Sequence, residues 1–445
     1  MSLTLSNLQR RWLGAAITSI VLMAVFALLG DGFKLWFFFA ETVLISIVIA
    51  QACDPFADAA QWVGDEAKLP GSVRGATLDA IASSMPELFS GIFFVLVAIS
   101  ASESAEARVA AGAEGYGATI ATCAGSAVYN MILIPAFCAL FISFYRKSRP
   151  TIDVDDEVIS RDGVWFVTTQ GLLVLFLFQD AMTWWMGVCF LVLYGVYIWQ
   201  LYNDTLIYRR RIAAVAAGRE ALGEAASATE LRDYIRQQGI KVTVDWLERL
   251  AAEEEADEEQ EDEDEDNSTG VLFGVFEVGI NARTAPIILL VSTLVAAGAC
   301  YFLVEATRGT AEQLGVPTFF VAVIIAAAAS SLPDTLLSIG AAMRGDDSGA
   351  VSNAFGSNIF DICVCTSIPL IVNSYLTGWQ PVSLMSDGEP IPGLVNLRIL
   401  LIVLTIVTLA IMWHNRQLTR RKAYVLCALY AVFIMYAVGG SLNWF

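Results

Sequence analysis

The feature of this chain that most restricts its fold is a polar hexapeptide that occurs twice, each time inside a long apolar run. The string Ala-Ser-Ser-Met-Pro-Glu at 82–87 returns as Ala-Ser-Ser-Leu-Pro-Asp at 329–334. A second pair follows, with Gly-Ser-Ala-Val-Tyr-Asn at 125–130 and Gly-Ser-Asn-Ile-Phe-Asp at 356–361. Carboxylates and hydroxyls are costly in hydrocarbon unless they face partners, water or an ion. Their repetition predicts a duplicated fold with an ion-handling site.

The composition and the apolar runs predict an all-α polytopic membrane protein. Of the 445 residues, 56% are hydrophobic and only 16% are charged, which is too apolar for a soluble domain. About 20 apolar residues cross a bilayer as a helix. Eleven segments qualify, near 12–30, 34–53, 73–100, 116–143, 163–179, 182–202, 285–306, 316–343, 349–373, 394–413 and 423–440. The first could instead be a signal peptide, but its core is long and no clean cleavage site follows, so we expect an extra transmembrane helix.

The distribution of basic residues predicts the orientation of these helices. Lys and Arg gather after the fourth and sixth segments and between the last two, at Arg146, Lys147, Arg149, Arg209, Arg210, Arg211, Arg416, Arg420, Arg421 and Lys422. A cytoplasmic N-terminus puts all three clusters on the cytoplasmic side, as the positive-inside rule favours. The two hexapeptides then lie in the third and eighth segments and run through the membrane in opposite senses. That parity predicts an inverted repeat.

These crossings divide the chain into four parts. We expect an extra N-terminal transmembrane helix at 1–33, a first five-helix repeat at 34–205, a cytoplasmic loop at 206–283 and a second five-helix repeat at 284–445. The formal charge of −19 comes mostly from an acidic run at 253–266 in the loop. This run could be a regulatory calcium-binding segment or a solvated linker. We favour the linker, because no EF-hand spacing with its turn glycine is present.

The residue types available favour hard cations bound by oxygen. His414 is the single histidine, so a histidine-ligated zinc or iron site is improbable. The eight cysteines are scattered, and we interpret them as buried apolar thiols. Pro86 and Pro333 each disturb the helical hydrogen bond to the carbonyl four residues earlier, which frees backbone oxygens. Calcium takes about 6–8 oxygen ligands, and sodium accepts a similar set with fewer charges.

The two halves together predict one cavity with three carboxylates and one amide, namely Glu87, Asp334, Asp361 and Asn130. The serines of the hexapeptides add hydroxyls, and the Gly-Ser pairs allow a neighbouring helix to approach closely. Three adjacent carboxylates in a low dielectric cannot all stay ionised while the cavity is empty, so it must hold cations or take up protons. The alternative is that these groups only pack helices together. Two matched Ser-Ser-x-Pro-acid strings argue against it.

These strings resemble the alpha repeats of the calcium/cation antiporter superfamily, that is the sodium/calcium exchangers, and most closely their potassium-dependent branch. The resemblance covers both membrane halves, through Cys53-Asp54-Pro-Phe, Gly75-Ala-Thr-Leu, the hexapeptides, and Ser352-Asn-Ala-Phe-Gly-Ser-Asn358-Ile-Phe-Asp361. It implies a ten-helix core of two inverted five-helix repeats. It also implies an ion-ligand set of Ser83, Ser84, Glu87, Ser126, Asn130, Ser330, Ser331, Asp334, Ser357 and Asp361, with Asn358 beside them.

This chain departs from the family pattern at three positions. Ala82 and Ala329 stand where the family usually has Gly, and Asp79 stands where it usually has Ala or Gly. Asp79 lies about 12 Å along the helix from Glu87. It could line an entry path on the cytoplasmic side or make a local hydrogen bond, and the sequence leaves both open. Asp361 resembles the potassium-dependent branch, but some exchangers carry Asp there without needing potassium, so potassium co-transport also stays open.

We therefore expect a secondary antiporter, not an enzyme, that exchanges calcium for sodium by alternating access. A proton-coupled calcium antiporter with the same carboxylates is the main alternative. An intramembrane aspartyl protease is disfavoured because the chain lacks Gly-x-Gly-Asp, and a passive cation channel would not require inversion. We expect no tightly bound cofactor and no nucleic acid. The expected partners are transported calcium, sodium and possible potassium ions and the lipid bilayer, in a plasma or bacterial inner membrane. The sequence leaves the oligomeric state open.

Overall fold

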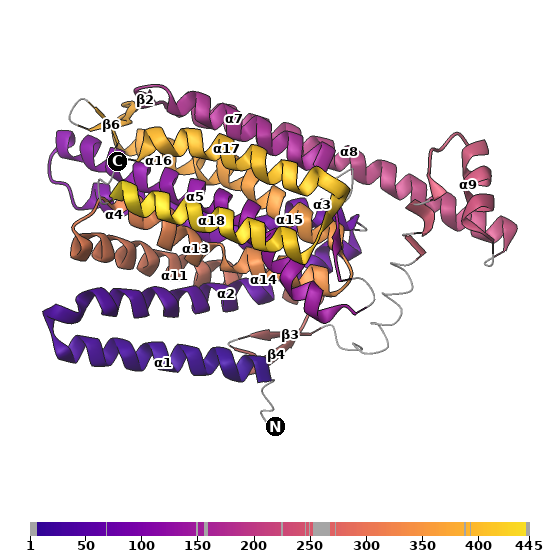
Figure 1. The fold of residues 1–445 in the computed structure, drawn as a ribbon, viewed down its shortest axis with the longest axis horizontal. Helices are drawn as coiled ribbons and strands as arrows, with labels where there is room; N and C mark the ends of the chain where they lie inside the picture. The colour runs from indigo at the N-terminus through magenta and orange to yellow at the C-terminus, as the bar shows by residue number, and fades with distance from the viewer. Residues whose placement is uncertain are drawn as a thin grey trace.

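The protein is a bundle of long helices that lie side by side (Figure 1). The computed structural model describes residues 7–441 apart from 68, 148–149, 155–158, 224–225, 245, 249, 252–267, 272, 387–388 and 392. Within these residues, ten helical stretches are long and apolar enough to cross a membrane, at Gln9–Leu29, Asp31–Glu66, Gly71–Ser100, Ala105–Tyr145, Trp184–Leu222, Thr284–Leu314, Thr318–Met343, Asp347–Leu376, Leu397–Arg416 and Arg420–Gly439. The predicted run 253–266 and Arg149 lie outside the described residues.

The helices alternate in direction along the chain (Figure 1). The first half contains α1 (Asn7–Leu29), η1 (Asp31–Phe33), α2 (Lys34–Glu66), α3 (Gly71–Arg74), α4 (Ala80–Ser100), α5 (Ala105–Tyr145), α7 (Val164–Leu177) and α8 (Trp184–Leu222). The second half contains α11 (Thr284–Leu314), α12 (Thr318–Val321), α13 (Ala327–Ser330), α14 (Leu332–Met343), α15 (Asp347–Phe360), α16 (Ser367–Leu376), α17 (Leu394–Trp413), η6 (His414–Arg416) and α18 (Arg420–Ser441).

Four short π-helical turns interrupt these helices. They are η2 (Gly75–Asp79), η3 (Ile159–Gly163), η4 (Ala322–Ala326) and η5 (Asp361–Cys365). Single π turns inside α-helices often occur at functional sites. Three of them adjoin the repeated motifs of the sequence.

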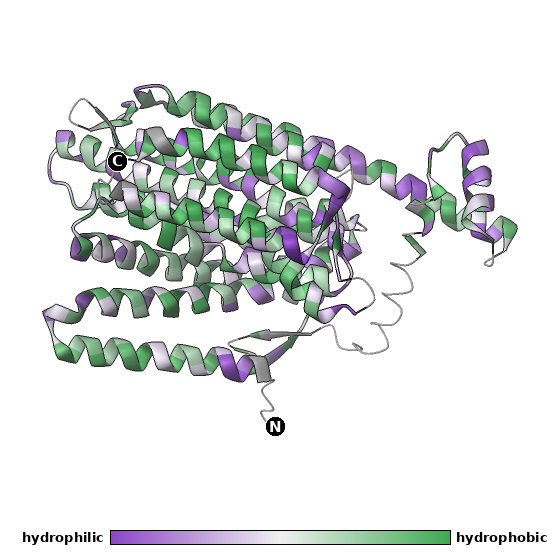
Figure 2. Cartoon of the chain, viewed as in Figure 1, coloured by the Kyte–Doolittle hydropathy of each residue, from purple (hydrophilic) through white to green (hydrophobic). Residues whose placement is uncertain are grey.

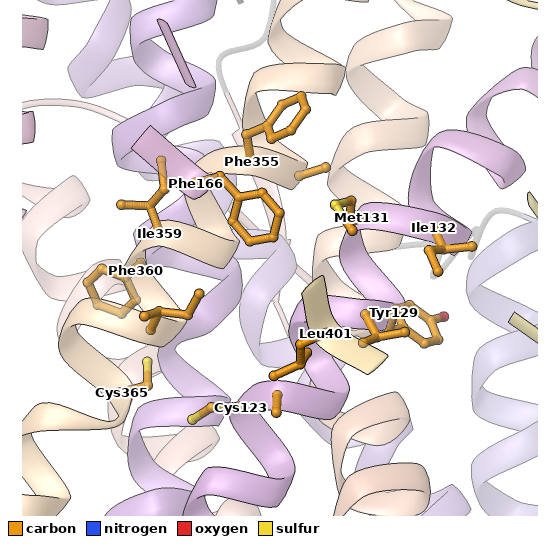
Figure 3. Packing of buried hydrophobic residues seen from close by; sticks show 14 of the residues in the cluster. Cys123, Tyr129, Met131, Ile132, Phe166, Phe355, Ile359, Phe360, Cys365 and Leu401 are labelled. Atoms are coloured by element: carbon orange, nitrogen blue, oxygen red, sulfur yellow. The ribbon is translucent and has the colours of Figure 1, made fainter. Parts of the chain in front are cut away.

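Every predicted apolar segment is helical, but several helices extend beyond the predicted bounds, with α2 ending at Glu66, α5 beginning at Ala105 and α11 ending at Leu314. The segment predicted at 163–179 is the turn η3 followed by α7, which has only 14 residues. It is still part of the bundle, because the Phe166 ring of α7 packs against Phe355 of α15 with ring centroids 6.2 Å apart (Figure 3). The helix predicted to end near 202 continues as α8 to Leu222, since the Arg- and Ala-rich sequence that follows contains good helix formers.

A small helical unit projects from one end of the bundle (Figure 1). Helix α9 (Ala228–Gln237) begins with a capping box between Ser227 and Glu230. Its apolar face packs on the end of α8 in a cluster of Ala214, Val215, Leu231, Ile235, Leu247 and Leu250. We call the end of the bundle from which α8 and α9 project the loop end, and the other the opposite end.

Two-stranded antiparallel pairs connect the two halves at both ends. At the loop end β1 (Ile152–Asp153) pairs with β8 (Gln417–Leu418), and at the opposite end β2 (Ala181–Met182) pairs with β5 (Val382–Ser383). The other pairs are local, β3 (Ser268–Val271) with β4 (Phe276–Gly279) and β6 (Met385–Ser386) with β7 (Glu389–Pro390). Pairs between loops at both ends require the two halves to have matching, alternating crossings.

The outer helices present apolar side chains outward, and the central helices are buried. Large exposed apolar residues include Leu28 on α1, Ile287 on α11 and Ile406 on α17. Figure 2 shows hydrophobic colour along the length of the bundle and hydrophilic colour concentrated at the loop end and on α9. In contrast, α5 is buried almost continuously from Gly115 to Ala136. Such an arrangement suits lipid contact around a protein-lined centre.

Candidate cation site

Each hexapeptide follows a π turn at the same distance. The turn η2 begins seven residues before Ala82, and η4 begins seven residues before Ala329. The two copies then differ, because α4 continues through Pro86 whereas the second helix breaks at Ser331, with φ −84° and ψ 4°, and restarts as α14 with Pro333 in its first turn. Proline is tolerated in a first turn, where its missing N–H has no helical partner.

Glycines from the second pair of motifs pack directly on these turns. A Cβ added to Gly125 of α5 would lie 2.2 Å from the carbonyl oxygen of Val323 in η4. A Cβ added to Gly356 of α15 would lie 2.7 Å from Ala76 in η2. Each half therefore supplies a glycine to the π turn of the other half. This exchange of roles is what a two-fold relation between the halves requires.

The close packing gathers the predicted acidic and amide groups in the centre. Glu87 of α4, Asn130 of α5, Asp334 of α14 and Asp361 at the start of η5 all have no solvent exposure. Asn130 Nδ2 donates to Asp334 Oδ2 at 3.2 Å, across the two halves. Within the described residues, no Lys or Arg side chain forms an ion pair with these carboxylates. The cluster thus has acceptor oxygens without a built-in cation.

Ser126 is the centre of this hydrogen-bond network. Its Oγ lies 3.2 Å from Glu87 Oε1, 2.8 Å from Asp361 Oδ2 and 2.8 Å from the Oγ of Ser331. Ser331 Oγ also donates to Glu87 Oε1 at 3.1 Å. A hydroxyl has one hydrogen, so Ser126 cannot donate to both carboxylates. A proton on one of the two acids, or a cation between them, would stabilise this close arrangement of carboxylates.

The second half repeats part of this arrangement. Ser357 Oγ donates to Asp334 Oδ1 at 2.6 Å, which is the counterpart of the contact between Ser126 and Glu87. Ser83 Oγ lies 3.4 Å from Ser357 Oγ and donates to the carbonyl oxygen of Asp79 at 2.8 Å. The Ser330 hydroxyl donates to the carbonyl of Ala327 at 3.2 Å. All of these serines are fully buried.

Several buried polar atoms of the cluster have no hydrogen-bond partner within the described residues. They are Ser84 Oγ, Glu87 Oε2, Asn130 Oδ1, Asp361 Oδ1 and both amide atoms of Asn358. Buried polar atoms in native proteins are nearly always satisfied, so such a group calls for a ligand, water or ion. No three Cys, His, Asp or Glu side chains of the described chain converge closely enough to hold a metal alone. Any coordination sphere here must therefore combine carboxylates with hydroxyl and amide oxygens.

Two residues near the cluster were not among the predicted site residues. Asn353 of α15 donates from Nδ2 to the carbonyl oxygen of Asp334 at 3.3 Å and to Ser338 Oγ at 2.8 Å. Tyr129 OH lies 3.3 Å from Thr335 Oγ1. Asn353 stands one turn before Ser357 on the same helix, and that spacing is the one signal by which the sequence could have indicated it.

The fold and the cluster define a polytopic membrane protein with two inverted five-helix repeats, one added N-terminal helix and a carboxylate-rich centre. Residues 35–203 and 284–439 match the family described as sodium/calcium exchanger protein. The chain belongs to this family of exchangers, as its resemblance to calcium/cation antiporters predicted.

The relatives it matches carry the names of sodium/potassium/calcium exchangers. Exchanger 5 of Homo sapiens is 23% identical over 392 residues, which cover 79% of this chain and 73% of that protein. Exchanger 2 of Homo sapiens is 30% identical over 138 residues, 31% of this chain and 20% of that protein. Among the exchangers 1, 2 and 4 that it matches, the chain spans between 11% and 27% of their length.

Two solved structures have the same fold. The sodium-calcium exchanger NCX_Mj soaked with Na+ and Sr2+ matches with a TM-score of 0.51 and 16% identity, over 89% of this chain and 97% of that chain. The H+/Ca2+ exchanger CAX matches with a TM-score of 0.57 and 14% identity, over 98% and 95%. The predicted all-α fold of two inverted repeats is confirmed.

Proposed function

We propose that this protein is a secondary antiporter that exchanges calcium for sodium by alternating access at the central cluster. The observation that carries the proposal is that oppositely directed helices of the two halves bring Glu87, Asn130, Asp334 and Asp361 into one buried group with unsatisfied oxygens. Glu87 and Asp334 would be the central calcium ligands, and Asn130 and Asp361 would complete sodium positions. The serine hydroxyls and Asn358 would supply further oxygens.

The chemistry of the ligand set supports calcium and sodium as the exchanged ions. Calcium accepts about 6–8 oxygens in a tolerant geometry, and the cluster offers carboxylate, hydroxyl and amide oxygens together. The same oxygens suit sodium, which carries half the charge. Asp361 and the sodium/potassium/calcium exchangers among the relatives raise potassium co-transport as an additional step. We further propose that the loop end faces the cytoplasm, because basic residues gather there. The membrane would be a plasma membrane or a bacterial inner membrane.

The proton-coupled calcium antiporter is the second candidate, and one contact favours it. Ser126 lies within hydrogen-bond distance of both Glu87 and Asp361, and a shared proton would satisfy that arrangement. The fold is also that of an H+/Ca2+ exchanger. In this alternative, protons displaced from the two acids would drive calcium in place of sodium.

Calcium uptake into proteoliposomes with the purified full-length protein separates these candidates. Sodium and proton gradients are imposed one at a time, each with and without potassium, with N-methyl-glucamine as the inert replacement cation. Uptake that requires an outward sodium gradient supports the proposal, and a further requirement for potassium would assign co-transport. Uptake driven by a proton gradient without sodium would assign the alternative. Calcium flux without any counter-ion dependence would overturn both.

A further inference from the structure

Two arginines of the first half pair with the second half at the loop end, Arg146 with Asp347 at 2.8 Å and Arg74 with Asp346. Arg74, the last residue of α3, lies 3.1 Å from Asp346, 3.1 Å from Asp65 and 3.9 Å from Asp79. The Arg74 side chain is 13% exposed, and those of Asp79 and Asp346 are 16% and 23% exposed. Asp65 is 59% exposed, so its pair contributes little. The contact with Asp346 is the one that crosses between the halves.

This ion pair lies beside a close approach between the backbones of the two halves. Asp346 is the N-cap of α15, where its Oδ1 accepts from the backbone N–H of Gly349 at 2.6 Å. A Cβ on Gly75 of η2 would lie 2.6 Å from the carbonyl oxygen of Gly349. The beginning of α15 is thus held against η2 by backbone contact and by charge together. Separating them requires that Arg74 release Asp346.

The elements η2 and α15 are also linked to the central cluster, through hydrogen bonds. The carbonyl oxygen of Asp79, at the end of η2, accepts from Ser83 Oγ at 2.8 Å, and Ser83 lies 3.4 Å from Ser357 of α15. A movement of α15 away from η2 would therefore open a route from the loop end toward Ser83 and Ser357. The carboxylate of Asp346 would then lose the Arg74 guanidinium and face water, while Asp79 would stay beside Arg74.

We propose that Arg74 is a gating residue of exchange, acting as a tethered cation that holds Asp346 while the loop end is closed and frees its carboxylate to attract entering cations when it opens. This inference rests on the proposed antiport. Arg74 does not contact the central cluster, so it acts by positioning η2 and α15. Counted from the hexapeptides, Arg74 and Asp79 correspond to Val321 and Ala326 in the other half, so this charged lock belongs to one end only.

Hydrogen–deuterium exchange of backbone amides tests the lock without requiring transport. We compare the full-length protein with Arg74→Met and with Asp346→Asn, which keeps an N-cap side chain but removes the charge. Both variants should exchange up to about fivefold faster in 71–83 and 347–357, and not in 318–329 at the opposite end. Arg108→Met, which removes an exposed arginine at the opposite end, is the matched control. Unchanged exchange at 71–83 and 347–357 in both variants would overturn the lock, and faster exchange everywhere would mean general destabilisation.

A second measurement separates gating from a merely structural role. In oriented proteoliposomes, Arg74→Met and Asp346→Asn should shift the protein toward the loop-open state. The calcium concentration for half-maximal flux should then fall on the loop side and rise on the other side, each by about the same factor. Equal changes on both sides would contradict gating. If the unaltered protein moves no calcium, the proposed function fails, while the exchange measurement still decides whether Arg74 locks the loop end.

Discussion

The π turns η2 and η4 are geometric counterparts, but their surroundings differ in chemistry. Around η2 the two halves meet through the ion pair of Arg74 with Asp346, and Arg74 also lies 3.9 Å from Asp79 of its own half. Near η4, Phe319 and Phe320 of α12 lie against Gly393 at the start of α17, where a Cβ would be 2.9 Å from the Phe320 ring. The contacts beside η2 at the loop end are thus charged, and those near η4 at the opposite end are apolar. The two ends should respond differently to salt, to charge removal and to added volume.

The largest effect is expected at the centre, where the halves are most alike. Glu87→Gln and Asp334→Asn each remove one carboxylate charge from a fully buried group. Losing one partner of a buried charge contact costs about 2–5 kcal/mol, so calcium flux should fall at least about thirtyfold in both. Initial rates of calcium uptake in proteoliposomes measure this.

The variants Glu87→Gln and Asp334→Asn also test whether the two halves contribute equally to the site. Similar thermal unfolding of both variants and the unaltered protein would show that folding is intact. A large loss in Glu87→Gln together with normal flux in Asp334→Asn would break the two-fold description of the site. Normal sodium-dependent flux in both would refute the ligand assignment.

A smaller effect on stability is expected where glycines pack on the π turns. Gly125→Ala would place a Cβ 2.2 Å from a backbone oxygen in η4, and Gly356→Ala 2.7 Å from backbone atoms in η2. Overpacking of this kind costs about 1–3 kcal/mol, and we expect Gly125→Ala to be the more destabilising. Thermal unfolding in detergent measures the loss.

Gly171→Ala on α7 provides the control, because no atom lies within 4 Å of its added Cβ. The same substitution there should leave the unfolding temperature nearly unchanged, or raise it slightly through helix propensity. If all three variants unfold alike, the close approach of α5 and α15 to the π turns would not be a tight constraint.

The sequence predicted the helices and their inversion because both depend on patterns that survive without tertiary detail. Apolar length defines a crossing, and the two hexapeptides define the correspondence between halves. The same repetition pointed to Glu87, Asn130, Asp334 and Asp361, which the fold brings together. Where propensity and hydropathy conflict, as beyond residue 202 in α8, hydropathy alone gave the wrong helix end.

The remaining features depend on contacts between distant parts of the chain. The π turns have no local sequence code, and they lie where Gly125 and Gly356 approach from another helix. Arg74 and Asp346 are 272 residues apart, so their ion pair could not be inferred from spacing. For Asp79 the sequence left open an entry path or a local hydrogen bond. In the structure its side chain is paired with Arg74, and its carbonyl oxygen accepts a hydrogen bond from Ser83. Ser126 appeared equal to the other serines, although it contacts two carboxylates.

The smallest predicted effect concerns salt, and it follows directly from the difference between the two ends. Partly exposed ion pairs contribute about 0.2–1 kcal/mol and are screened, with a Debye length of about 10 Å at 0.1 M and about 3 Å at 1 M salt. Raising choline chloride over this range should increase amide exchange at 71–83 and 347–357 by a factor of up to about five. Exchange at 318–329 and 394–400 should stay constant or fall, because apolar contacts are not screened. In Arg74→Met the increase with salt at the loop end should be lost or reversed, since the attraction is gone and salt screens only the repulsion among the remaining aspartates. A salt response of equal size at both ends would mean that charge does not distinguish them.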